Sequence, residues 1–434
     1  MGDLDDVRTR HGFATRAIHA GQDPDPTTGA VVTPISLSTT FAQDGVGGHK
    51  GFEYSRSGNP TRSALEAQIA SLEDAAHGLA FASGLAAEDN VLRLLRPGQR
   101  ILLGNDAYGG TFRLISKVWA PLGFPWAAVD LTDLDSLRAN WPDDVGMVWL
   151  ETPTNPLLTC FDIEAIAEIG RAKGAIVVVD NTFATPYLQQ PLTLGAHVVV
   201  HSATKYLGGH GTAIAGVIVD SGNFDWTQGR HPGFTTPDPS YHGVVFAELG
   251  PPAFALKARV QLLRDLGSAA APFNAFLISQ GLETLSLRIE RHVANAQRVA
   301  EFLSGHDGVV SVNYAGLPTS PWYEIGKKLA PKGTGAVLAF ELAGGIEAGK
   351  AFVNALTLHS HVANIGDVRS LVIHPASTTH AQLSPEEQLA TGVTPGLVRL
   401  AVGIEGIDDI LADLEQGFVA AKPFAGVPRT AVSM

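Results

Sequence analysis

The chain has 434 residues, of which 45% are hydrophobic and 17% are charged, a composition typical of a soluble globular protein with roughly two to three domains. Its net charge of −13 argues against a nucleic-acid partner, because nucleic acids are bound by basic surfaces. No apolar run reaches about 18 residues, so no membrane partner is expected, and the single cysteine, Cys160, fits a reducing cytoplasm as a buried structural thiol.

Residues 1–62 are rich in Gly, Pro, Ser and Thr and predict an extended arm with little core of its own. Disorder is the alternative for such a composition. Phe41, Phe52, Tyr54 and Arg56 favour an arm that packs on a neighbouring subunit, because disordered segments are poor in aromatic residues.

Strands and helices alternate after the arm. Short apolar runs predict a strand that starts near residue 79, and further strands at 101–103, 126–129, 147–151, 176–180, 198–201 and 213–219. Helical patterns lie between several of them, including 86–95 and 163–172. This alternation predicts an α/β fold of right-handed βαβ units with a mainly parallel sheet.

Residues 221–250 contain several Gly and Pro residues and predict a long loop, which in a compact domain is usually functional or part of an interface. A helical stretch over 272–303 leads into a smaller α+β domain with strands at 336–342 and 397–402 and helices at 346–355 and 407–420. We therefore expect an arm at 1–62, a large domain at 63–270, a C-terminal domain at 271–422 and a tail at 423–434.

Two of the predicted strands deliver an acid and a lysine. The run 176–180 ends in Asp180, and Lys205 closely follows the run 198–201. Since ligands bind at the carboxyl ends of parallel strands, this pair indicates a pyridoxal phosphate enzyme, with Lys205 as the Schiff-base lysine and Asp180 paired to the pyridine nitrogen. The alternatives are an ion pair of Asp180 with an arginine and a solvated Lys205.

Further residues suit the phosphate of that cofactor. Ser202 and Thr204 carry hydroxyls close to the lysine. Ser83 and Gly84 stand at a strand-to-helix turn, where backbone N–H groups bind phosphate. Capping of the helix by Ser83 would look the same in the sequence.

Other candidates follow or lie in predicted strands. Tyr108 precedes two glycines and would stack on the pyridine ring, although packing is the commoner role, and Asn155 would donate to the phenolate oxygen or form a turn. Arg399 would bind a carboxylate through its guanidinium fork, either that of an amino-acid substrate or that of Glu405. The histidine groupings lack further ligands at a suitable spacing, so no metal site is expected.

Several motifs together resemble the cysteine/methionine-metabolism family of fold-type I pyridoxal phosphate enzymes, over about residues 12–420. They are Tyr54-Ser-Arg-Ser-Gly-Asn-Pro-Thr61, Ser83-Gly84, Tyr108-Gly-Gly-Thr111, Glu151-Thr-Pro-Thr-Asn-Pro156, Val179-Asp-Asn-Thr182 and His201-Ser-Ala-Thr-Lys-Tyr-Leu-Gly-Gly-His210. The resemblance implies a seven-stranded-type sheet with helices on both faces, and a cytoplasmic homotetramer built as a dimer of dimers.

The resemblance also implies roles for individual residues. Tyr54 and Arg56 would reach the phosphate of a neighbouring subunit's cofactor, while Leu85 and Thr182 would join the cofactor site. Ser370 would join Asn155 and Arg399 at the substrate. Tyr108 would assist Lys205 in catalysis.

The two halves of the chain resemble different members of the family. Residues 1–175 are similar to cystathionine γ-synthases, and the rest is similar to O-acetylhomoserine sulfhydrylases. The implied reaction is γ-replacement on O-acetyl- or O-succinylhomoserine by sulfide or methanethiol, in methionine biosynthesis. Arg113 matches a position linked to the succinyl carboxylate. The alternatives are a cystathionine γ-synthase, a γ-lyase, and a non-catalytic protein that retains the fold.

Overall fold

The computed structural model describes residues 11–228, 230–382 and 384–424. The chain divides into two compact units. Unit 1 comprises the described residues up to Glu151 together with Phe161–Ser286. Unit 2 comprises Thr152–Cys160 and the described residues from Leu287 onward. The division at Ser286 and Leu287 lies beyond the predicted boundary at 270, because helix α12 (Pro272–Glu283) packs on helix α3 (Pro60–Leu72) within unit 1.

Unit 1 is built on a seven-stranded sheet, as far as the described residues show, with the strand order β1-β7-β6-β5-β4-β2-β3. Its strands are β1 (His77–Phe81), β2 (Arg100–Gly104), β3 (Trp126–Val129), β4 (Val145–Glu151), β5 (Ile176–Asp180), β6 (Val198–Ser202) and β7 (Gly216–Asp220). The four pairings among β6, β5, β4, β2 and β3 are parallel. The predicted α/β fold with a mainly parallel sheet is confirmed.

Strand β7 is the antiparallel member, paired with both β6 and β1. The connection from β6 to β7 contains no helix. A parallel return normally requires a crossover of a dozen or more residues, usually a helix, so the chain turns back antiparallel here. The predicted strand 213–219 also starts later, at Gly216.

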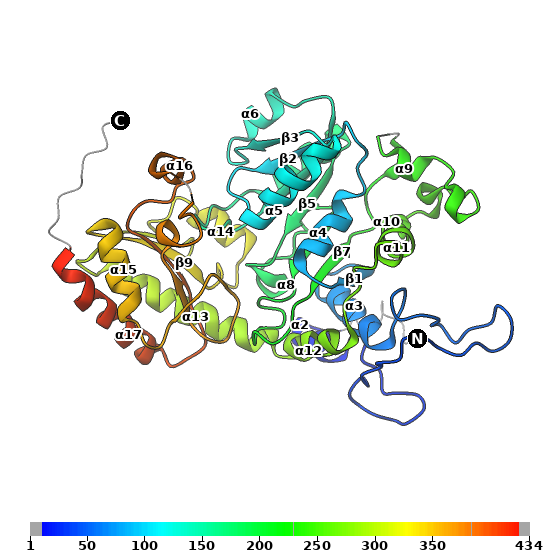
Figure 1. Ribbon diagram of the computed structural model, residues 1–434, viewed down its shortest axis with the longest axis horizontal. Coiled ribbons are helices and arrows are strands. Elements are labelled where there is room, and N and C mark those ends of the chain that lie inside the picture. The colour runs from blue at the N-terminus through cyan, green and yellow to red at the C-terminus, as the bar shows by residue number, and fades with distance from the viewer. Residues whose placement is uncertain (1–10, 229, 383, 425–434) are drawn as a thin grey trace. The chain divides into compact units, whose positions relative to one another are not determined.

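Helices cover the sheet of unit 1. They are α2 (Phe13–His19), α3 (Pro60–Leu72), α4 (Gly84–Leu92), α5 (Gly109–Arg113), α6 (Leu134–Ala139), α7 (Ile163–Lys173), α8 (Thr185–Leu188), α10 (Ala253–Lys257), α11 (Arg264–Leu266) and α12 (Pro272–Glu283). Helix α4 contacts β1, β6 and β7, and Figure 1 shows it in front of the strands. Ile176, Val178, Val198 and Val200 share one buried cluster with Ala87 and Val91 of α4.

Part of the arm differs from the predicted extended segment. Helix α2 packs on α3 and α12, and the side chains of Arg16 and Ala17 are buried. The guanidinium of Arg16 lies 2.5 Å from the carboxylate of Asp74, which fixes α2. Residues 21–59 contain only a bridge between Thr40 and Tyr54 and expose apolar side chains at Val31 and Leu37, among others.

The region 221–250 is not a structureless loop. It contains η3 (Trp226–Gln228), α9 (Pro232–Thr235), η4 (Pro239–Tyr241) and η5 (Phe246–Leu249). Trp226 stacks on Phe234 with ring centroids 3.7 Å apart. These aromatic side chains join the core cluster of the sheet, which is why a segment rich in turn residues becomes ordered.

Unit 2 contains a second sheet with the order β10-β11-β12-β9-β8. Its strands are β8 (Val309–Asn313), β9 (Val337–Leu342), β10 (Ser360–His361), β11 (Leu371–Ile373) and β12 (Leu397–Ala401). Its helices are α13 (Leu285–Ser304), α14 (Tyr323–Leu329), α15 (Gly345–Ala355), α16 (Pro385–Ala390) and α17 (Ile407–Ala421), and α15 packs against α17. The predicted helical stretch 272–303 is thus two helices, interrupted at Thr284. The smaller α+β unit is confirmed.

Candidate active site

Three strands of unit 1 end in polar residues on the same face of the sheet. Glu151 ends β4, Asp180 ends β5 and Ser202 ends β6. Glu151 is paired in register with Asp180, and paired residues of parallel strands point to one face. Side chains two residues apart in a strand point to the same face, so Asp180 lies on the face of Ile176 and Val178. These two residues share a buried cluster with α4, which therefore covers the face of Asp180.

Asp180 is buried and tied to the next strand. Its Oδ1 accepts a hydrogen bond from the backbone N–H of Thr182 at 3.0 Å. The Thr182 hydroxyl oxygen in turn accepts from the backbone N–H of Ser202 at 2.8 Å. Thr182 therefore links the ends of β5 and β6, which fixes Asp180 relative to the turn that carries Lys205.

Two further buried acids lie near Asp180, and sequence reasoning assigned neither a role. Glu88 comes from α4 and Glu151 from β4. Burial, followed by the charge of Asp180, raises the pKa of both carboxyls well above the usual range. Burial also raises the pKa of Asp180, but its hydrogen bonds with Thr182 and the charge of His201 act in the opposite direction. The pKa of Asp180 is therefore raised less strongly than those of Glu88 and Glu151.

Lys205 lies in the turn after β6. The backbone N–H of Lys205 donates to the Ser202 carbonyl, and its own carbonyl accepts from the N–H of Gly209 at 2.7 Å. Gly209 adopts a left-handed conformation, with φ +73°, which favours glycine at this point. Strands β5 and β6 are adjacent and parallel, so Asp180 and the turn that carries Lys205 stand at the carboxyl ends of neighbouring strands.

Helix α4 begins beside the same strand end. A Cβ at Gly84 would lie 3.0 Å from the Cβ of Ser202, so its backbone approaches β6 closely. Ser83 caps the helix, and its Oγ accepts the N–H of Ala86 at 3.1 Å. Leu85 is partly exposed. The Thr204 hydroxyl, in contrast, is engaged with the backbone of Ala215 in β7's lead-in segment.

Tyr108 is held by one of the buried acids. Its backbone N–H donates to Glu151 Oε2 at 2.7 Å, and its ring lies over Gly110, where a Cβ would meet ring carbon at 2.2 Å. Burial raises the pKa of the Tyr108 hydroxyl, and the charge of Arg113 lowers it. Arg113 itself is exposed at the end of α5. Because Gly110 has no side chain, the ring of Tyr108 itself can lie against the backbone there.

Tyr54 and Arg56 contact each other rather than the strand ends. The Arg56 guanidinium lies 5.1 Å from the Tyr54 ring centroid and donates to the carbonyl oxygen of Arg264. Both side chains are exposed. Their predicted role at a neighbouring subunit stays a prediction.

The predicted substrate ligands lie in unit 2. Arg399 of β12 donates to Asn155 Oδ1 at 2.9 Å and to the Asn364 carbonyl at 3.0 Å. Glu405 is engaged by Ser370, whose hydroxyl donates to it at 2.9 Å. Of the predicted substrate ligands, Asn155 and Arg399 are therefore hydrogen-bonded to each other, whereas Ser370 is hydrogen-bonded to Glu405.

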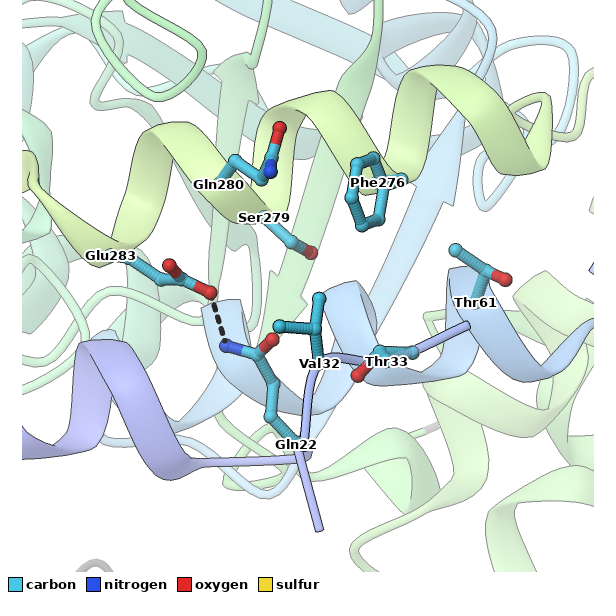
Figure 2. Close-up of a pocket in the computed structure, with 8 residues that line it drawn as sticks. All are labelled: Gln22, Val32, Thr33, Thr61, Phe276, Ser279, Gln280 and Glu283. Carbon is cyan, nitrogen blue, oxygen red and sulfur yellow. Dashed lines mark hydrogen bonds between the residues drawn. The ribbon is translucent and has the colours of Figure 1, made fainter. Parts of the chain in front are cut away.

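Other candidate features fall outside this set. Burial raises the pKa of Cys160 to about 12, as suits a structural thiol. In the described parts of the chain, no cluster of three or more His, Cys, Asp or Glu side chains is suited to a metal ion, and no helix is long and apolar enough to cross a membrane. A pocket between the arm and α12, where Gln22 donates to Glu283 at 3.2 Å, contains none of the predicted site residues (Figure 2).

The residues of unit 1 fit pyridoxal phosphate. Asp180 offers a buried anion for a protonated ring nitrogen, Lys205 offers a primary amine, and α4 directs its N-terminus at the edge beside Ser202. Asp180 in particular is a buried charge, which is stable only beside a compensating cation or donors.

Comparison with known proteins agrees with this fit. Residues 14–419 match the model of a family described as Cys/Met metabolism PLP-dependent enzyme. The O-acetyl-L-homoserine sulfhydrylase of Leptospira meyeri is 47% identical, with 93% of this chain and 95% of the relative covered. The cystathionine gamma-synthase of Mycobacterium bovis is 45% identical, with 95% and 99% covered.

A solved structure from Campylobacter jejuni has the same fold, with a TM-score of 0.90 and 37% identity. It covers 94% of this chain and 100% of its own, and carries N'-pyridoxyl-lysine-5'-monophosphate at position 205. The predicted family resemblance and the predicted cofactor are confirmed.

Proposed function

The chain belongs to the Cys/Met-metabolism family of PLP-dependent enzymes, and we propose that it catalyses γ-replacement on an O-acylhomoserine by a sulfur nucleophile. With sulfide the product is homocysteine, and with methanethiol it is methionine. The observation that carries this proposal is the 47% identity to an O-acetyl-L-homoserine sulfhydrylase over nearly the full length of both chains.

Bound pyridoxal phosphate supplies an electron sink for the bonds at the α-carbon of an amino acid. Asp180 serves this chemistry by pairing with the protonated ring nitrogen, which requires the carboxylate to be ionised. Its link through Thr182 to Ser202 holds the carboxylate at the strand end. Ser83, Gly84, Leu85, Ser202 and Thr204 would surround the phosphate.

Lys205 is the residue that moves protons. Its amine would accept the proton from Cα and hand it on before it accepts, with Tyr108, a proton from Cβ. The acyl group then leaves Cγ as a carboxylate, and the thiol loses its proton as its sulfur adds at Cγ. Lys205 finally returns protons to Cβ and Cα, which completes the product. One flexible base can serve both carbons because they are adjacent. The hydrogen bond from the Tyr108 N–H to Glu151 fixes the backbone position from which the tyrosine side chain extends.

Arg399 and Asn155 bind the α-carboxylate of the substrate in this proposal. The planar guanidinium presents parallel N–H donors that match a carboxylate. The 2.9 Å contact between Arg399 and Asn155 holds the guanidinium in one orientation. Ser370 would support the same region through its hydrogen bond with Glu405.

A second candidate is a cystathionine γ-synthase or γ-lyase. The 45% identity to the Mycobacterium bovis cystathionine gamma-synthase supports it, and the exposed guanidinium of Arg113 suits a succinyl carboxylate. The nucleophile of a γ-synthase would be cysteine, whereas a γ-lyase would eliminate the γ-substituent without adding a thiol. Both candidates use the same cofactor residues and differ in the donor and the thiol.

We also propose that the active form is a cytoplasmic homotetramer, assembled as a dimer of dimers in which Tyr54 and Arg56 complete a neighbour's phosphate site. The exposed apolar side chains of the arm support it, since Val31 is 77% and Leu37 is 71% exposed.

Steady-state rates with acetyl- and succinylhomoserine, each combined with sulfide, methanethiol and cysteine, test the proposal. We expect sulfide or methanethiol to give the highest kcat/KM. Cystathionine formation as the fastest reaction would favour the second candidate, and a purified protein that binds no cofactor and turns over none of these pairs would contradict both.

A further inference from the structure

A buried carboxylate and a histidine lie on the sheet face opposite Asp180. Glu73 follows the last residue of α3, and His201 stands in β6 one residue before Ser202. His201 alternates with Val200 and Ser202, so it points away from the face that α4 covers. The Nε2 of His201 lies 2.6 Å from Glu73 Oε1, and both side chains are fully buried.

Asn181 connects this pair to the strand that ends in Asp180. Its Nδ2 donates to the same Glu73 Oε1 at 3.1 Å and to the Gln189 carbonyl at 2.9 Å. Its backbone N–H donates to the carbonyl of Val200 in β6. One carboxylate oxygen therefore ties together the ends of β5 and β6, immediately beside Asp180.

A fully buried carboxylate is costly unless a cation and donors compensate it. The His201 ring is the partner that the structure gives to Glu73, through the 2.6 Å contact. Burial raises the pKa of Asp180, and the interaction with His201 acts in the opposite direction. The pair thus affects both where Asp180 lies and the electrostatic surroundings of its carboxyl.

We propose that Glu73, His201 and Asn181 are positioning residues that hold the carboxyl of Asp180 in place for the ring nitrogen of the cofactor. This inference rests on the proposed role of Asp180. None of the three residues needs to touch the cofactor or the substrate.

The variant His201→Gln tests it, because the glutamine amide retains a donor toward Glu73 and removes the titratable ring. We expect the dissociation constant of pyridoxal phosphate to rise about tenfold, which corresponds to about 1.4 kcal/mol of binding free energy. The readout is the dissociation constant of pyridoxal phosphate, from its visible absorbance after equilibrium dialysis of the holoenzyme.

A double-mutant cycle with Asp180→Asn separates positioning from general destabilisation. If His201 acts through Asp180, then His201→Gln should change cofactor affinity by less than about twofold in the Asp180→Asn background. Equal weakening in both backgrounds, or no weakening in the wild-type background, would overturn the proposal. If Asp180→Asn alone leaves affinity unchanged, the proposed role of Asp180 fails as well.

Two further variants control for folding. Glu73→Gln keeps the shape of the side chain and should weaken cofactor binding in the same Asp180-dependent way, which replaces the test if His201→Gln does not fold. His197→Gln changes another buried histidine of unit 1, which directly precedes β6 and so lies at the opposite end of this strand from His201. Its Nδ1 accepts the Val177 N–H at 2.9 Å. It should lower stability and leave cofactor affinity unchanged.

Discussion

The carboxyl of Glu151 accepts the backbone N–H of Tyr108 at 2.7 Å, so a buried acid at the end of β4 fixes the start of α5. Burial raises the pKa of Glu151 well above the usual range, and the hydrogen bond from the Tyr108 N–H acts in the opposite direction.

Glu151→Gln should therefore be nearly neutral, because the amide oxygen can accept the same N–H. Glu151→Ala should lower the free energy of unfolding by about 1 kcal/mol, since it removes the acceptor of the Tyr108 N–H. Urea denaturation of both variants measures this. Equal losses for Gln and Ala would show that Glu151 contributes through its charge instead.

Lys205→Ala should abolish turnover and the covalent attachment of the cofactor. Borohydride reduction of the wild-type holoenzyme, followed by mass spectrometry of its peptides, should find the pyridoxyl label on Lys205. Lys117→Ala, at an exposed lysine of the same unit, should leave both labelling and activity unchanged. A label on any other lysine would refute the assignment.

Arg399→Lys should raise KM for the amino-acid substrate by about 10- to 100-fold, because a lysine cannot reproduce two parallel N–H bonds to a carboxylate. Cofactor absorbance should stay normal. The matched change Arg298→Lys, on the exposed face of α13, should have no effect on KM. An unchanged KM in Arg399→Lys would argue that this arginine is structural.

Arg113→Ala should reduce kcat/KM for the succinyl donor more than for the acetyl donor, because only the succinyl group carries a second carboxylate. Arg138→Ala, which removes an exposed, ion-paired arginine, is the control. Parallel losses for both donors would remove the proposed role of Arg113 in donor choice.

Buried histidines should make the protein sensitive to acid. Burial lowers the pKa of His197, His231 and His292 to about 4, from an unfolded value of about 6.5. Because the folded pKa is depressed, the unfolded state binds more protons in this window. Stability is therefore complete above about pH 6.5 and falls as the pH decreases toward 4.

Each of these histidines should contribute up to about 1.4 kcal/mol per pH unit to that fall. His231 packs edge-on against Phe224 and Trp226, so His231→Phe should reduce the slope by about one proton. The free energy of unfolding of the holoenzyme, measured by urea at several pH values, gives the slope. An unchanged slope in the variant would contradict the prediction.

Local patterns were sufficient for much of the fold. The valine runs that precede Asp180 and Ser202 are too apolar to form surface segments and too short to form helices. Strands β5 and β6 could therefore be predicted almost to the residue. The region 221–250 was mispredicted because its short helices are stabilised by contacts such as that of Trp226 with Phe234, not by their own periodicity.

The site divides in the same way. Asp180 and Lys205 could be proposed from the sequence because Asp180 ends β5 and Lys205 lies in the turn after β6, and parallel strands place their carboxyl ends at one edge. Glu88 gave no such signal, since a glutamate inside a helix is normally exposed, and only the packing of α4 on the sheet buries it beside Asp180.

The sequence by itself therefore determined the strands, the acid and lysine at their ends, and the family that uses them. The tertiary structure alone decided which distant side chains meet: Glu73 with His201, and Asn155 with Arg399. The physical reason is that hydrophobic periodicity is a local property of the chain. The pairing of buried polar groups depends instead on how helices and strands far apart in sequence pack together.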